Sequence, residues 1–457
     1  MEKIQHLYWR AGFGLSPREW NAKQNLNLQQ AIDELFREAG ADWPVEAPPP
    51  PSERPARGMS EEQKKQLQEQ ERESLSQVRK DWLKRMASPR HSALMERMSL
   101  FWHGHFACQT FSGTLAFQQL RTIRKYAFGK FGDLVLAIAR DPAMIRFLNN
   151  QQNHKDKPNE NFARELMELF TIGRGHYTEQ DIKEAARAFT GWSSNLQGIY
   201  TFRPQVHDYG SKTFFGQSGA FDGTDIIAMI LEKRETAQFI TRKVYRYFVN
   251  EKVDEALVED LSRRFYDSDY DIGQLMRTIF ESDWFYAPHN IGVKIKSPVE
   301  LVAGIMRTLD VRFIDDKALV FLQRALGQVL YHPPNVAGWA GGKTWIDNAT
   351  LMMRLNLVGY LFQLSEFNFR VKDEPEAAMG GKALRRIDAT VDLEPLMQLL
   401  EGVPPEHYSE RFASYLLQAR PQLSTSLLNG YTSHNSNWDY ARTLAMRLMS
   451  LPEYQMC

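Results

Sequence analysis

Helix-start signals recur along this chain more often than any other local pattern. Residues 16–19 read Ser-Pro-Arg-Glu, a serine N-cap followed by proline in the first turn and glutamate at the third helical position. Residues 297–300 repeat the device, and 60–63 and 178–181 are close variants. Each signal opens a segment with helical spacing of apolar residues, and strand signals are sparse. The sequence therefore predicts an all-α, multi-helix globular fold.

The strand signal is confined to one region. Residues 198–203 alternate between apolar and polar side chains, and residues 212–215 form a second short candidate. We expect at most a short β-hairpin near 198–216, in which the first segment pairs with the second.

Composition excludes several classes of protein. Lys plus Arg and Asp plus Glu both number 56, so no overall charge favours nucleic acid or an anionic membrane. The two cysteines, Cys108 and Cys457, exclude a disulfide framework and a Cys-rich zinc module. The hydrophobic fraction of 43% supports a sizeable core.

Several sequence signals are missing. The chain has no apolar run of about 18 residues, so we expect no transmembrane helix. The first residues lack the apolar stretch of a signal peptide, which predicts a cytoplasmic location by default. Walker, Rossmann, zincin-helix and nucleophile-elbow motifs are also missing, so the common nucleotide and hydrolase chemistries have no sequence support.

Shifts in composition predict four parts of the chain. A proline run at 48–51 indicates an extended linker, and the charged stretch 61–84 indicates a solvated helix that projects from the body. A polar stretch at 372–389 separates the last part. The predicted parts are an N-terminal helical segment (1–43), a linker with the projecting helix (44–90), a main helical domain with the candidate site (91–371) and a C-terminal helical unit (390–457).

Residues 159–170 combine charged groups with an apolar stripe at helical spacing. Glu165 and Glu168 are neighbours on one flank of this predicted helix and can ligate a metal or act as a general base. Arg164 can pair with Glu160, four residues earlier. The alternative is that Arg164 and other arginines neutralise the carboxylates in a structural network. The predicted stripe consists of Ala163, Leu166, Met167 and Phe170.

Two further segments carry groups capable of chemistry. On a helix, His103 and His105 point about 200° apart and cannot share a metal, but a helix end near Gly104 frees His105 to turn inward. The alternative is an aromatic helix end with capping histidines. His207, Asp208 and Lys212 offer a ligand or base, an acid and a cation within one predicted loop, where turn structure is the alternative.

Five segments occur in an order that resembles a known family. They are 10–14, 101–106, 159–192, 207–212 and 327–339, and together they resemble the bacterial domain-of-unknown-function 1800 family from about 7 to about 454. Members of that family are often encoded beside a second family related to alkaline phosphatases and sulfatases, frequently with an export signal on the neighbour. The resemblance thus implies little about activity, but it implies such a protein as a partner, or export alongside it.

Two hypotheses about function follow. The first is a metal-dependent enzyme, in which iron, manganese or zinc activates water or dioxygen, or polarises an anionic or oxygen-bearing substrate. Its expected groups are catalytic Glu165, Glu168, His207, Asp208 and Lys212, and metal-ligating His105, Glu165 and His207. The second is a non-catalytic binding or assembly partner of the neighbouring phosphatase- or sulfatase-like protein, in which the same groups form a buried structural network.

Overall fold

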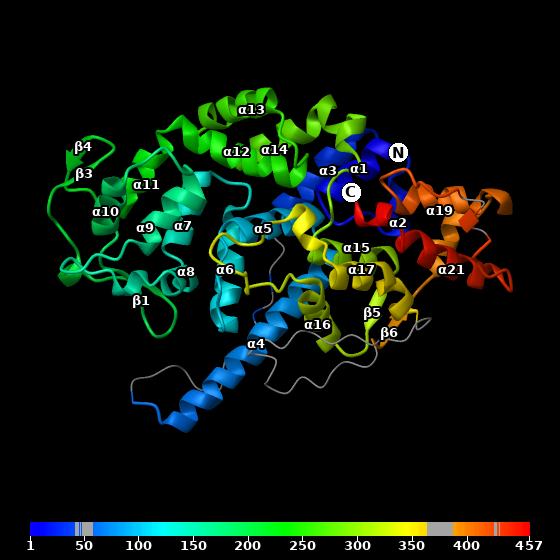
Figure 1. The fold of residues 1–457 in the computed structure, drawn as a ribbon, viewed down its shortest axis with the longest axis horizontal. Helices are drawn as coiled ribbons and strands as arrows, with labels where there is room; N and C mark the ends of the chain where they lie inside the picture. Colours follow the sequence, from blue (N-terminus) through cyan, green and yellow to red (C-terminus); the bar gives the residue numbers. More distant parts are fainter. Residues whose placement is uncertain (42–44, 46, 48–57, 363–386, 425–426, 429) are drawn as a thin grey trace.

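The computed structural model is mostly helical (Figure 1). Its strands, in the part of the chain that is described, form three two-stranded antiparallel sheets, so the predicted all-α fold class is confirmed. The predicted linker at 48–51 and most of the separating stretch, 372–386, lie outside the described residues. The structure describes residues 1–41, 45, 47, 58–362, 387–424, 427–428 and 430–457.

Every predicted helix start is confirmed as a capping box. At each one a Ser or Thr side chain accepts a hydrogen bond from the main-chain N–H three residues later. The side chain of that later residue in turn accepts a hydrogen bond from the main-chain N–H of the Ser or Thr. Each box satisfies N–H groups that a helix leaves unpaired, which stabilises it by about 1 kcal/mol. The helices so started are α2 (Pro17–Lys23), α4 (Glu61–Ala87), α10 (Glu179–Ala188) and α15 (Pro298–Thr308).

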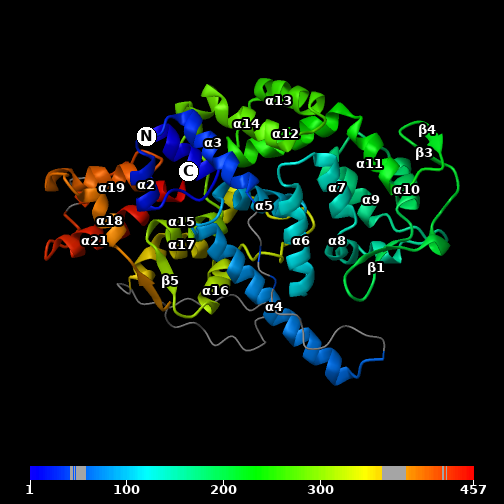
Figure 2. The same ribbon diagram turned by 180° about the vertical axis from the view of Figure 1, so that it is seen from behind.

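Helix α4 is half projecting and half buried. Its first half extends away from the body in both Figure 1 and Figure 2. Its second half buries Leu75, Trp82 and Met86, so this part is not solvated as the sequence predicts. No helix among the described residues has both the length and the apolar character that a membrane span requires.

A buried carboxylate joins α4 to the two helices at the centre, α5 (Ala93–His105) and α6 (Gly113–Tyr126). The Glu96 side chain of α5 is 1% exposed. It accepts hydrogen bonds from Trp82 Nε1 (3.0 Å) and Arg85 Nε (2.7 Å), and it pairs with Arg124 of α6.

The remaining helices surround this centre (Figure 1). The N-terminal helices are α1 (Glu2–Arg10) and α3 (Leu28–Gly40). One arm contains α7 (Phe131–Ala139), α8 (Pro142–Phe147), α9 (Asn161–Glu165), α10 and α11 (Gly223–Leu231). Along one edge lie α12 (Arg234–Phe248), α13 (Glu255–Asp267) and α14 (Ile272–Glu281). The other arm contains α15, α16 (Lys317–Leu326), α17 (Asn348–Leu361), α18 (Glu394–Met397), α19 (Tyr408–Leu416) and α21 (Asn437–Met449).

Short turns of other helical types complete the fold. The 3-10 turns are η1 (Asn150–Gln152), η3 (Pro204–Val206), η4 (Asp283–Tyr286), η5 (Pro288–Asn290), η6 (Gly342–Trp345), η7 (Gln398–Leu400), η8 (Pro405–His407) and η9 (Pro452–Gln455). A π-helix, η2, spans Leu166–Thr171. It continues α9 directly, and the candidate site depends on it.

The predicted pairing of 198–203 with 212–215 is wrong, because each segment pairs with its own neighbour along the chain. A nearby strand pairs at a smaller loss of loop entropy than a distant one. In the second hairpin, Phe215 and Gly216 have φ angles of 48° and 79°, which match a tight turn with two positive φ values. The pairs are β1 (Trp192–Ser194) with β2 (Tyr200–Phe202), β3 (Lys212–Phe214) with β4 (Gln217–Gly219), and the unexpected β5 (Val311–Phe313) with β6 (Ala389–Val391).

The C-terminal helices pack directly on the N-terminal ones. Gln5 of α1 donates through Nε2 to the carbonyl of Tyr415 in α19 (2.6 Å). The Tyr415 hydroxyl in turn donates to the carbonyl of Leu15 (2.7 Å). One connected apolar core runs from Ile4 to Tyr454 among the described residues, so these contacts belong to a continuous interior.

We expect Glu96→Gln to lower the free energy of unfolding by about 3 kcal/mol, because the substitution leaves two buried guanidinium groups without their carboxylate. Urea denaturation measures this loss. Glu73→Gln, at an exposed position on α4, is the matched control and should change stability by less than about 0.5 kcal/mol. Equal effects of the two substitutions would contradict the role given to Glu96.

Candidate functional site

The predicted helix over 159–170 changes its hydrogen-bond pattern midway, from α9 to the π-helix η2. The predicted apolar stripe is buried, and none of its four members is more than 1% exposed. The wider π-turn leaves the carbonyl groups of Leu169 and Phe170 to side chains of other helices. π-Turns within helices often occur at functional sites, which makes this turn the natural centre of the candidate site.

His105, at the end of α5, is held between this turn and α12. Its Nε2 lies 3.0 Å from the Phe170 carbonyl, which only accepts, so Nε2 carries the proton. Its Nδ1 then accepts from Lys243 Nζ (3.3 Å), and Lys243 also donates to the Leu169 carbonyl (2.8 Å). Burial, together with the charge of Lys243, lowers the pKa of His105. Burial also lowers the pKa of Lys243 to about 8.

His103 faces a different part of the molecule, as its helical separation from His105 predicts. Its Nε2 accepts from the main-chain N–H of Tyr331 (3.2 Å), and its ring packs on Trp82 and Trp339. Helix α5 ends at His105, one residue after Gly104, as the sequence predicts. His105 therefore reaches inward from a complete helical turn.

The two carboxylates of the predicted site differ in their partners. Glu168 accepts from Arg174 Nε (2.6 Å). Glu165 is half-buried and makes no hydrogen bond or ion pair with the described residues. Burial, and then repulsion from Glu168, raise the pKa of Glu165. Arg164 pairs with Glu160 (3.0 Å), as the sequence predicts, and with Glu179 (2.8 Å), and no ion pair joins it to Glu165 or Glu168 in the described part of the chain.

His207 is fixed against the end of α10. Its Nδ1 donates to the Thr190 carbonyl (2.8 Å), and the side chain is 5% exposed. The rings of Phe202 and Tyr209 pack against the imidazole with centroid distances of 5.3 and 4.7 Å. This histidine therefore attaches the loop that follows β2 to the main chain at Thr190.

Asp208 and Lys212 are engaged within the same loop. Arg187 binds Asp208 through Nε (2.7 Å), and the Gly210 N–H donates to the same carboxylate (2.8 Å). Burial alone raises the pKa of Asp208, but these two bonds outweigh it and lower the pKa. Lys212 Nζ donates to the carbonyls of Asp208 (2.6 Å) and Gly210 (3.1 Å), and burial lowers its pKa.

The predicted metal ligands are not assembled as a set. Across the described ranges, no group of three or more His, Cys, Asp or Glu side chains is placed to hold a metal ion. His105 binds the π-turn, Glu165 lies beside Glu168, and His207 binds Thr190. The structure thus brings together His105 with Lys243, and Asp208 with Lys212, but it does not group His105, Glu165 and His207.

The family described as "Protein of unknown function (DUF1800)" matches residues 6–456, which is nearly the whole chain. The chain belongs to this family. No curated protein and no solved structure matches it. Three of the segments that carry the family resemblance bind one another here, since 101–106 contacts both η2 and the loop at Tyr331.

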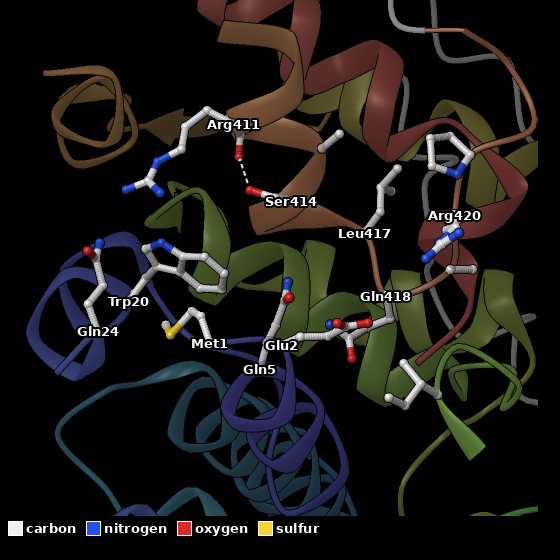
Figure 3. Close-up of a pocket in the computed structure, with 14 residues that line it drawn as sticks. Met1, Glu2, Gln5, Trp20, Gln24, Arg411, Ser414, Leu417, Gln418 and Arg420 are labelled. Carbon is white, nitrogen blue, oxygen red and sulfur yellow. Dashed lines mark hydrogen bonds between the residues drawn. The ribbon is translucent and has the colours of Figure 1, made fainter. Parts of the chain in front are cut away.

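A cleft that sequence patterns do not reveal lies between α1, α2 and α19 (Figure 3). It has a volume of about 470 Å³ and is open to solvent. Its lining mixes the apolar side chains of Trp20 and Leu417 with polar groups, among them Gln418. Arg411 and Arg420 lie at opposite sides of the cleft in Figure 3.

Sequence reasoning missed both this cleft and Lys243. Lys243 sits in an ordinary amphipathic helix, where a lysine gives no signal of its partners. The cleft joins residues about 400 positions apart, such as Gln5 and Leu417, and single-sequence patterns carry no information on such long-range contacts.

The buried histidines make stability depend on pH. Burial lowers the pKa of His103 to about 3 and that of His105 well below its ordinary value. Below about pH 6.5 the unfolded chain takes up protons at both imidazoles and the folded chain does not, so stability falls on acidification. Each such histidine contributes a slope of about 1.4 kcal/mol per pH unit. Asp141 opposes this, because burial raises its pKa to about 7.

We expect His105→Gln to reduce the slope of the free energy of unfolding against pH by about one proton equivalent between about pH 6 and about pH 5. Urea denaturation at several pH values measures this slope. His289→Gln, at an exposed position, should leave it unchanged. The slope is the diagnostic quantity, because packing changes alone shift stability equally at every pH. An unaltered slope in His105→Gln would show that this imidazole is protonated in the folded state.

Proposed function

We propose that this protein is a non-catalytic binding partner of another protein and that the cleft of Figure 3 receives an acidic segment of that partner. One observation carries the proposal. The imidazole and ammonium groups of His105, His207, Lys212 and Lys243 are used to hold main-chain carbonyl groups. Groups so engaged fix the arrangement of helices, which is the structural network that the second hypothesis expects.

The cleft has the chemistry of a binding site. Half of its lining residues are apolar and half are polar or charged, so the cleft offers an occupant both apolar surface and hydrogen-bonding groups. Trp20 and Leu417 line the cleft but are only 3% and 7% exposed, so most of their surface is packed in the core. The cleft lies between α1, α2 and α19. Figure 1 places these helices away from α9, the helix that η2 continues.

Charge selects an acidic occupant. Arg420 is exposed and makes no hydrogen bond or ion pair with the described residues. Arg411 uses Nε to bind the Leu399 carbonyl (3.2 Å). Among the described residues that line the cleft, Glu2 carries a carboxylate and Arg411 and Arg420 carry guanidinium groups. Such groups favour carboxylate partners and increase the rate of association with them.

The phosphatase- or sulfatase-like protein encoded beside family members is the partner to test first. Arg420→Glu should weaken the complex of the two purified proteins about tenfold, measured as Kd by biolayer interferometry. Arg246→Glu, at an exposed position on α12 outside the cleft, is the matched control and should bind as the wild type does. A mixture in which the two proteins do not associate, or equal weakening in both variants, contradicts the proposal.

Glu165 favours a second candidate, the metal-dependent enzyme. Its carboxylate is half-buried, has no hydrogen-bond partner among the described residues and has a raised pKa beside Glu168. A carboxyl group of raised pKa suits a general acid, and a free carboxylate suits a metal ligand. The predicted ligands His105 and His207 bind main-chain carbonyl groups and are not grouped with Glu165, so this candidate rests on Glu165.

Metal analysis tests this candidate directly. Protein purified without chelator and titrated with iron, manganese or zinc should bind about one metal ion per chain. Glu165→Gln should abolish that uptake, whereas Glu73→Gln, at the exposed control position, should not. Mass spectrometry of the desalted protein gives the metal content. A wild-type chain that takes up none of the three metals rules the candidate out.

A further inference from the structure

Arg411 is the more firmly held of the two arginines that line the cleft of Figure 3. It is half-buried in α19, and its Nε donates to the Leu399 carbonyl (3.2 Å). The two terminal nitrogens of its guanidinium group make no hydrogen bond or ion pair with the described residues. The bond to Leu399 therefore fixes the side chain and leaves its outer edge able to bind a carboxylate through two N–H groups.

Arg420 belongs to a main-chain segment that is held on both sides. Ala419 packs so closely on Gly292 that a Cβ on the glycine would lie 2.9 Å from the Ala419 main chain. On the other side, the Gln422 N–H donates to the Glu453 carboxylate (2.9 Å). The Arg420 side chain is exposed and unpaired among the described residues. The fold therefore fixes where Arg420 leaves the main chain, and its guanidinium group stays available to a ligand.

The part of the cleft between the two arginines is negative and neutral. In Figure 3, Glu2, Gln5 and Gln418 lie between Arg411 and Arg420 across the width of the cleft. Glu2 is exposed, and in the described part of the chain it forms no ion pair with either arginine. The two guanidinium groups are therefore not neutralised by Glu2, and a carboxylate separates them.

We propose that the cleft selects its occupant by the order of charges along the occupant's chain. The preferred segment has one acidic residue for each arginine and an uncharged stretch between the two acids. Glu2 rejects an acid within that stretch, because like charges that face each other weaken binding. The inference rests on the proposed function, since it describes the acidic segment that the cleft receives.

An uninterrupted acidic run is the competitor that the cleft must reject. Such a run carries more charge, so the two arginines attract it more strongly at long range. Inside the cleft, its central acids lie against Glu2. We expect the repulsion to weaken binding of the run about threefold, a modest effect because water screens exposed charges. The order of charges, rather than their number, then decides which segment binds better.

Synthetic peptides of equal length test this selection. One set carries two glutamates separated by two, three, four or five alanines, and the continuous peptide carries glutamate throughout. Fluorescence anisotropy of the labelled peptides measures Kd for the wild-type protein at low ionic strength, where exposed charges act most strongly. The best spaced peptide should bind at least about threefold more tightly than the continuous peptide. A continuous peptide that binds as tightly as every spaced one, or a set in which no peptide binds, overturns the inference.

Glu2→Gln tests whether Glu2 is the side chain that rejects the continuous peptide. The substitution should tighten binding of the continuous peptide about threefold and change that of the best spaced peptide less than about 1.5-fold. Glu73→Gln, which also removes an exposed carboxylate but on α4, is the matched control and should alter neither Kd. Equal effects of the two substitutions contradict the role given to Glu2.

The spaced peptide should need both arginines. Arg411→Gln and Arg420→Gln should each weaken its binding at least about threefold, because each removes the partner of one glutamate. Arg246→Gln, at an exposed position on α12, is the matched control and should bind as the wild type does. Weakening by only one of the two cleft substitutions overturns the inference, since the peptide would then pair with a single guanidinium group.

The inference and the proposed function can fail separately. A protein complex that Arg420→Glu weakens, together with peptides whose charge order has no effect, overturns the inference and leaves the proposed function standing. Peptides that bind in the expected order, together with two purified proteins that do not associate, support the inference and contradict the partner named above.

Discussion

Helix α5 is the element to which the rest of the structure is tied. Its buried polar side chains each bind a different neighbour. Glu96 binds α4 and α6, and the next residue, Arg97, binds Glu300 of α15. His103 and His105 bind the loop at Tyr331 and the π-turn η2. Because each of these bonds is directional and buried, α5 fixes the position of both arms at once.

These buried contacts specify the arrangement more than they add net stability. A buried ion pair roughly repays its desolvation, but breaking it leaves a costly unpaired charge. The Glu96 carboxylate is fully paired, because two guanidinium groups and an indole N–H bind it. Around Glu300 the balance differs, because Arg10 and Arg354 keep buried nitrogens without hydrogen-bond partners among the described residues.

Local features were predictable from the sequence, and spatial gathering was not. Capping boxes depend on residues three apart and ion pairs along a helix on residues three or four apart. The start at Ser297 and the pair of Glu160 with Arg164 were therefore predicted correctly. The predicted pairing of 198–203 with 212–215 was wrong. The alternating pattern marks both segments as strands but does not say which strand each one pairs with. The partners of His105 could not be predicted, for a different reason. Whether an imidazole meets a metal or a carbonyl group depends on helix packing, which periodicity does not encode.

Helix α4 connects an exposed end to the buried centre of the molecule. A helix of 27 residues is about 40 Å long, and roughly half of it stands clear of the body. Its buried end carries Trp82 and Arg85, which donate hydrogen bonds to the carboxylate of Glu96. A sideways force on the exposed tip is therefore delivered as torque to the point where α4, α5 and α6 meet. A partner that binds the exposed end of α4 could therefore act on the contacts around Glu96 without touching them.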